Sequence, residues 1–176
     1  MAQLTSLQIG SGRPEGMYRH APWVNVDVYR PKPRGKFVQA SGTALPFADG
    51  AFTRIHAIHV LEHLPRDLHL PMLREIARVL AGNGAGCAFI EVPDFLSVVR
   101  LLVAAADRGE HEECRIRTVG VYGKGRHFGD FHHWGWSPWY LEQRINEAGM
   151  RCRRDHEMVS AHWKQEPVLL FKCWRG

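Results

Sequence analysis

The sequence predicts an α/β protein with a mostly parallel sheet and helices on both faces. Three observations lead to this prediction. Short apolar runs with strand character alternate with longer segments of helical period. A glycine-rich turn follows the first run, and two more strand-like runs lie near the C-terminus. Such alternation is typical of sheets whose ligands bind beyond the carboxyl ends of the strands.

Four strands are expected before the first long helix. Residues 4–9 form an apolar run that ends at Gly10, and residues 23–28 alternate between apolar and polar side chains. Residues 37–39 fit a short strand, and residues 52–60 are rich in apolar and β-branched side chains. The carboxyl ends of these strands are where we look for binding residues.

A helix is expected over residues 65–80, because apolar side chains recur there every three or four positions until the glycines at residues 82–84. Residues 87–92 read as another buried strand, ended by Pro93. A second helix is expected over residues 95–106.

The last part of the chain begins with an irregular stretch. Residues 107–136 show no clear periodicity, and Ser137 then fits a helix N-cap with Pro138 at the first helical position. Residues 150–157 and 168–174 read as two closing strands that could pair as a hairpin.

Size and composition fit one globular domain spanning residues 1–176, with 45% hydrophobic and 23% charged residues. The net charge is +5 and the pI about 9.3, but basic residues are spread along the chain. A small or modest substrate is therefore favoured over a nucleic acid. We expect a monomer or a homodimer.

The four cysteines contain no CxxC pair, so free thiols in a reducing compartment are expected. The N-terminus lacks a signal peptide, and the longest apolar stretch, residues 95–106, is too short to span a bilayer. These features predict a cytoplasmic protein.

The turn after the first strand combines with an acidic residue at the end of the second. Gly10, Ser11 and Gly12 allow a tight turn and close approach of a ligand, while Asp27 can accept hydrogen bonds from ribose hydroxyls. The turn is neither a full GxGxxG motif nor a P-loop. A plain turn and a surface Asp are the alternative, and nucleoside binding is the favoured interpretation.

Five further segments, in this order, resemble the class I S-adenosylmethionine-dependent methyltransferases, and among them the small type 11 group. They are residues 38–52, 59–64, 73–84, 90–94 and 135–150. The resemblance implies a Rossmann-like class I methyltransferase fold with a seven-stranded sheet and an antiparallel last strand. It also implies S-adenosyl-L-methionine as cofactor, S-adenosyl-L-homocysteine as product, and methyl transfer to an O, N or C nucleophile.

The resemblance also implies positions for the cofactor. Its methionine part would lie over Gly10, Ser11 and Gly12, its ribose would bind Asp27, and its adenine would lie beside Ser41 and Gly42. His59 would follow the fourth strand, near the methyl group. The chemistry requires no metal.

Three positions depart from the family pattern, because neutral side chains replace acidic ones at Gln8, Ser41 and Thr53. A non-catalytic or regulatory protein that binds the cofactor is therefore an alternative. A third interpretation is a zinc hydrolase, since His59, Glu62 and His63 match the HxxEH pattern. Pro65 directly after this pattern favours a helix start there, which argues against a zinc-binding helix.

The segment 107–136 is expected to act as a lid or specificity segment. It contains an aromatic and histidine-rich run in which His132 or His133 could serve as general base, with Trp139 beyond it as a structural anchor. Other side chains of this region are expected at the substrate: His127, Trp134 and Trp136. Asp94 could either orient the substrate or cap the following helix.

Overall fold

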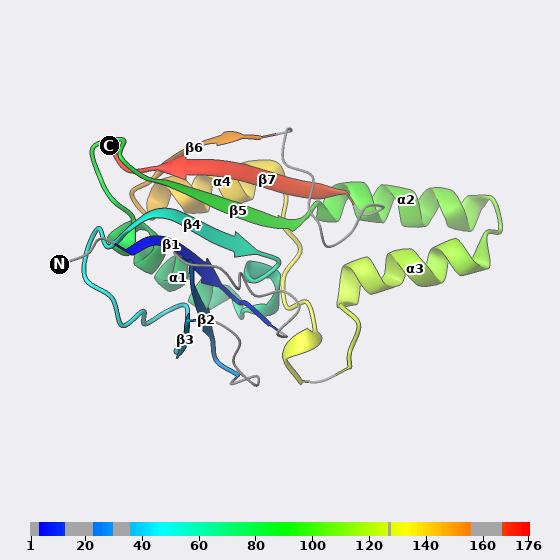
Figure 1. Cartoon of the computed structure of the whole chain (residues 1–176). Coiled ribbons are helices and arrows are strands. Elements are labelled where there is room, and N and C mark those ends of the chain that lie inside the picture. Colours follow the sequence, from blue (N-terminus) through cyan, green and yellow to red (C-terminus); the bar gives the residue numbers. More distant parts are fainter. Residues whose placement is uncertain (1–3, 13–22, 30–35, 127, 156–166) are drawn as a thin grey trace.

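The computed structural model describes residues 4–12, 23–29, 36–126, 128–155 and 167–176 (Figure 1). Its strands are β1 (Leu4–Ile9), β2 (Trp23–Asp27), β3 (Lys36–Gln39), β4 (Phe52–Ile58), β5 (Cys87–Pro93), β6 (Arg151–Arg154) and β7 (Val168–Trp174). Its helices are α1 (Arg66–Val79), α2 (Phe95–Asp107), α3 (His111–Tyr122) and α4 (Pro138–Glu147), with short 3-10 helices η1 (Leu61–His63) and η2 (Phe128–Asp130).

The seven strands form one sheet in the order β3-β2-β1-β4-β5-β7-β6. The strands from β1 to β5 pair in parallel, whereas β7 is antiparallel to both β5 and β6. The expected fold class is thus confirmed, including the antiparallel last strand. The strand order reverses between β1 and β4, so this is the switch point where such sheets bind ligands.

One face of the sheet carries the apolar core. Leu7, Ile9 and Ile55 are buried there with Ile90, because alternate residues of each strand face the same side. The helices α1 and α4 contact each other and lie behind the sheet in Figure 1. Among the described helices, only these two cover a face of the sheet, so the helices that were also expected on the other face stay a prediction.

Polar and aromatic residues occupy the opposite face, where His56 of β4 is 4% exposed. The His56 ring packs edge-on against Trp23 and Phe89, and Arg54 Nε donates to its Nε2 at 3.2 Å. Burial, followed by the positive charge of Arg54, lowers the pKa of His56 to about 4. The imidazole is therefore neutral at neutral pH.

The expectation of an irregular segment over residues 107–136 is wrong in part, because α3 occupies residues 111–122. Salt bridges one turn apart, Glu112 with Arg115 and Glu113 with Arg117, support this helix. It packs beside α2, and the pair projects beyond the sheet (Figure 1).

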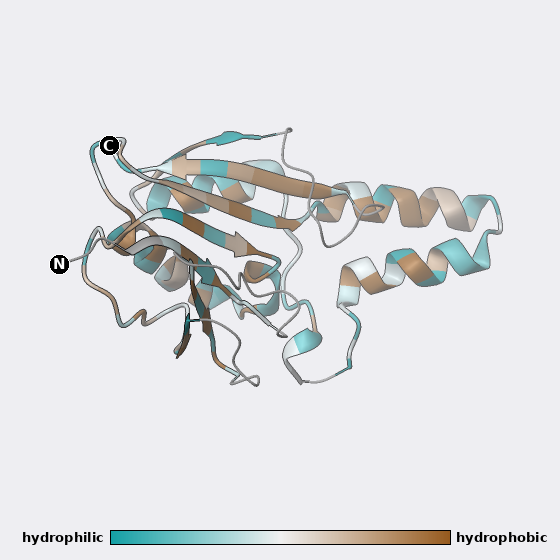
Figure 2. Cartoon of the chain, viewed as in Figure 1, coloured by the Kyte–Doolittle hydropathy of each residue, from teal (hydrophilic) through white to brown (hydrophobic). Residues whose placement is uncertain are grey.

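Colouring by hydropathy shows α2 as mostly apolar (Figure 2). None of the described helices combines the length and apolar character that a membrane crossing needs.

Arg78 of α1 holds the connection between β3 and β4. Its guanidinium donates to the carbonyl oxygens of Phe47 and Leu45 at 2.7 and 2.9 Å, and to Asp49 Oδ1 at 2.8 Å. Glu75 pairs with Arg78 and also accepts from the Leu45 amide at 2.7 Å. One side chain thus orders a connection that has no regular secondary structure of its own.

We expect Arg78→Met to lower the free energy of unfolding by about 1–3 kcal/mol, because two carbonyls and a partly buried carboxylate lose a charged donor. Urea denaturation measures this loss. Arg74→Met is the matched control, since Arg74 is exposed on the same helix. Equal stability of the two variants would contradict the role given to Arg78.

Candidate functional site

The turn after β1 requires glycine at Gly10. The backbone there has φ +67°, and a Cβ would lie 2.3 Å from Cγ2 of Val60, which follows β4. The amides of Gly10 and Ser11 both donate to the Val26 carbonyl, at 2.9 and 3.2 Å. The carboxyl ends of β1, β2 and β4 therefore meet at this turn.

Asp27 and Gly12 are brought together, as the sequence predicts. Asp27 Oδ2 accepts from the Gly12 amide at 2.7 Å, and Oδ1 accepts from the Tyr29 amide at 3.0 Å. Each carboxylate oxygen still has a lone pair for a further donor. The Ser11 hydroxyl is buried without a hydrogen-bond partner, and no described atom lies within 4 Å of a Cβ built on Gly12.

Ser41 and Gly42 lie directly after β3. The Ser41 hydroxyl lies 2.8 Å from the hydroxyl of Thr43 and accepts from its amide at 3.2 Å. Gly42 is closely packed, because a Cβ there would lie 3.2 Å from both Ile9 Cγ2 and Met72 Sδ. Thr53, one of the departures, is at the amino end of β4 and therefore lies at the opposite edge of the sheet from this site.

His59 follows β4 and lies between two buried carboxylates. Its Nδ1 is 3.0 Å from Oε1 of Glu62, and its Nε2 is 3.1 Å from Oε1 of Glu91, in β5. Its backbone has φ +52°, and its amide donates to the Glu91 carbonyl at 2.9 Å. Burial alone would lower the pKa of His59, but hydrogen bonds and ion pairing with both carboxylates raise it to about 10.

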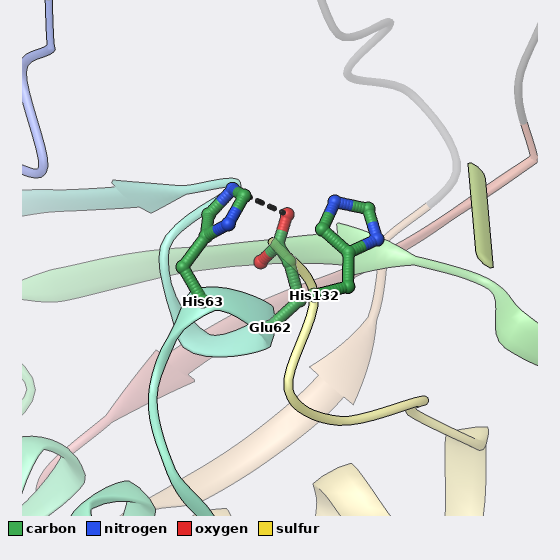
Figure 3. Close-up of side chains that lie close together, drawn as sticks. All are labelled: Glu62, His63 and His132. Carbon is green, nitrogen blue, oxygen red and sulfur yellow. Dashed lines mark ion pairs between the residues drawn. The ribbon is translucent and has the colours of Figure 1, made fainter. Parts of the chain in front are cut away.

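Glu62 also connects η1 with the segment that follows η2. The Glu62 carbonyl accepts from the amides of His133 and Trp134 at 2.7 and 3.3 Å. This places the ring of His132 with its centroid 4.9 Å from that of His63. Figure 3 shows the Glu62 carboxylate between the two imidazoles.

Burial opposes ionisation of Glu62, yet its hydrogen bond to His59 and the charges of His59 and His63 lower its pKa below the ordinary value. Burial lowers the pKa of His132; the negative charge of Glu62 partly opposes this shift, and the charge of His63 adds to it. Glu62 is therefore an anion and His132 a neutral imidazole at neutral pH.

Residues 107–136, the segment expected to act as a lid, approach the edge of the sheet at which the parallel strands end. A Cβ on Gly129 would lie 3.2 Å from the ring of Tyr29, which follows β2. Phe131 is exposed, and so is the side chain of His133. His127 lies outside the described residues.

Two tryptophan expectations are wrong. Trp136 was expected at the substrate, but it is fully buried and stacks on Tyr140. Trp139 was expected as an anchor, but it is 67% exposed. Trp134 is half-buried, with Arg66 over its ring and Tyr140 beside it, so it packs against the core.

Asp94 caps α2, and each of its carboxylate oxygens accepts a hydrogen bond from Ser97. Oδ1 accepts from the Ser97 amide at 3.2 Å and Oδ2 from the Ser97 hydroxyl at 2.9 Å. The capping alternative is therefore confirmed, and a contact of Asp94 with the substrate stays a prediction.

The HxxEH pattern does not form the zinc-binding helix of the hydrolase interpretation. His59 lies before η1 in a left-handed backbone conformation, and both of its ring nitrogens face carboxylates. With both ring nitrogens directed at carboxylates, neither is directed at an ion shared with His63. Sequence reasoning also missed the pairing of Glu91 with His59, although an acidic residue within an apolar strand was a signal for it.

Comparisons with known proteins agree with the resemblance found in the sequence. Residues 22–88 match the family model described as Methyltransferase domain. No curated protein sequence matches the chain. Many solved methyltransferase structures share its fold at low sequence identity.

One such structure is the 1,6-didemethyltoxoflavin-N1-methyltransferase of Burkholderia thailandensis with S-adenosylhomocysteine, at 15% identity and TM-score 0.60, covering 97% of this chain and 70% of that one. The YcgJ protein of Bacillus subtilis has 13% identity and TM-score 0.62, covering 98% and 92%. The O-methyltransferase NcsB1 from neocarzinostatin biosynthesis, with S-adenosylmethionine and 2-hydroxy-5-methyl naphthoic acid, has 16% identity and TM-score 0.59, covering 99% and 50%.

The opposite pKa shifts of His59 and His56 predict a stability maximum. His59 has a raised pKa, so its contribution is complete below pH 6.5 and is lost as the pH rises through about 10. His56 has a lowered pKa, so its contribution is complete above pH 6.5 and is lost as the pH falls to about 4. For these two groups together, the folded state is most stable near pH 6.5.

An NMR titration of the histidine rings measures both values directly. We expect the His59 ring to remain protonated at pH 8 and the His56 ring to remain neutral at pH 5.5. Titration of His59 near pH 6.5, the ordinary value for histidine, would contradict the ion pairing described above.

Proposed function

We propose that this chain transfers a methyl group from S-adenosylmethionine to a small acceptor bound beside His59. The observation that carries this proposal is the contact between the Asp27 carboxylate and the Gly12 amide. It joins the glycine turn and the acidic strand end at the switch point of the sheet, where nucleoside ligands bind in such folds. The Methyltransferase domain match over residues 22–88 supports the same activity.

The residues present fit this cofactor. Among the described residues, the buried Ser11 hydroxyl has no hydrogen-bond partner and no atom lies close over Gly12, so the turn can accept a polar ligand against its backbone. Asp27 would hold the ribose hydroxyls, and Ser41 and Gly42 would border the adenine. The hydroxyl of Ser41 can still make hydrogen bonds, although without the charge assistance of a carboxylate.

The cofactor supplies a methyl group that is already activated by the positive sulfur. The chain then has to align the acceptor with that methyl group, exclude water and take up a proton where the acceptor carries one. Of the two histidines expected as base, His132 is the better placed, because it is half-buried beside Glu62 and neutral. The segment after α3 would close over the acceptor, with Phe131 and Tyr29 offering exposed aromatic surface.

The acceptor is proposed to be a small molecule. The structures of the Burkholderia and neocarzinostatin enzymes hold compact aromatic compounds, 1,6-didemethyltoxoflavin and 2-hydroxy-5-methyl naphthoic acid. The exposed aromatic side chains at this edge suit stacking on such a ring. Oxygen, nitrogen and carbon nucleophiles all remain compatible with this proposal.

We expect Asp27→Ala to weaken binding of S-adenosylhomocysteine by at least about tenfold, because two charge-assisted hydrogen bonds to the ribose are lost. Isothermal titration calorimetry measures the affinity. Asp107→Ala is the control, since Asp107 is exposed at the end of α2. Unchanged affinity in a folded Asp27→Ala protein would show that the ribose binds elsewhere, and no binding by the unaltered protein would refute the function.

A further inference from the structure

Glu62, His63 and His132 form a cluster that methyl transfer itself does not require. One potential ligand atom from each of them lies within 4.8 Å of the others. They come from two distant parts of the chain, η1 and the segment after η2, and Figure 3 shows the three side chains converging. Such convergence of two imidazoles and a carboxylate calls for an explanation.

Hydrogen bonds fix the tautomer of both histidines. His63 Nδ1 lies 3.0 Å from the Phe131 carbonyl, and His132 Nδ1 lies 3.0 Å from the Gly120 carbonyl. A carbonyl oxygen can only accept, so each Nδ1 carries the proton and each Nε2 keeps its lone pair when the ring is neutral. Histidines that bind metals are typically oriented in this way, by donating the other ring N–H to a carbonyl or a carboxylate.

The carboxylate of the cluster is buried and only partly satisfied. Glu62 is 1% exposed, and its Oε2 has no hydrogen-bond partner. Two buried carboxylates, those of Glu62 and Glu91, thus face the single imidazole of His59. Buried carboxylates are costly unless cations or metal ions compensate them.

We propose that Glu62, His63 and His132 bind a first-row divalent transition metal ion. Two histidines and one carboxylate are the protein ligands of known catalytic zinc and iron sites, and they leave a coordination position open. Ligand atoms about 2.1 Å from one ion in tetrahedral geometry lie about 3.4 Å apart. The 3.9 Å between His63 Nε2 and Glu62 Oε1 needs only a small closure to reach this value.

The ion would connect η1 with the segment after η2, and its open position would lie beside the proposed methyl-transfer site. This location rests on the proposed function, but the metal site itself does not. Coordination would use Nε2 of His132, the atom that a general base would need. The two roles of His132 therefore exclude each other, and the expectation that no metal takes part would need revision.

Titration with Co²⁺ tests the site, because its visible absorption reports coordination by nitrogen and oxygen ligands. We expect the tag-free, chelator-treated protein to bind one Co²⁺ per chain and Zn²⁺ to displace it. His63→Ala and His132→Ala should each weaken binding at least about tenfold. His111→Ala is the matched control, since this histidine is exposed at the start of α3.

A further variant, Glu62→Gln, keeps the shape of the side chain and removes its charge. Circular dichroism checks that each variant is folded. Absence of Co²⁺ binding in the unaltered protein would overturn the proposal, as would equal affinities of the His63→Ala, His132→Ala and His111→Ala proteins. Calorimetry with S-adenosylhomocysteine in the presence of EDTA separates the two proposals. Cofactor binding that is retained without any Co²⁺ binding would refute the metal site and leave the proposed function standing.

Discussion

The imidazolium of His59, between the carboxylates of Glu62 and Glu91, is the interaction on which the arrangement of the site depends. Removing these groups from water is costly, and only their mutual pairing offsets the cost. The pairing fixes the exit of β4, the start of η1 and the end of β5 relative to one another. Through the Glu62 carbonyl, which accepts from His133 and Trp134, it also positions the segment that carries His132.

The scaffold could be predicted because it depends on local patterns. Apolar or alternating runs of strand length predicted most of the seven strands, and the glycines after the first run predicted the tight turn at Gly10. That Gly12 and Asp27 lie at the same edge of the sheet could be expected, because parallel strands end there, whereas their hydrogen bond was not predicted. These features need no knowledge of the tertiary packing.

The features that the sequence did not predict depend on contacts between distant segments of the chain. α3 lacks a strong apolar stripe, so its ion pairs and its packing on α2 were not visible as a period. Trp136 lies in the core and Trp139 at the surface, the reverse of what was expected. The reason is how the chain enters α4, where Trp136 packs against His69 and Tyr140. Likewise, His132 meets His63 only because the chain returns to η1 after α3.

A crystal structure with S-adenosylhomocysteine bound is the most direct test of the claim that this edge of the sheet holds the cofactor. We expect the ribose hydroxyls to bind Asp27 and the amino-acid part to lie along Gly10–Gly12. We expect the sulfur to be directed toward His59, whose ring should still lie between Glu62 and Glu91. A ligand elsewhere on the sheet, or a His59 ring turned away from both carboxylates in the complex, would contradict it.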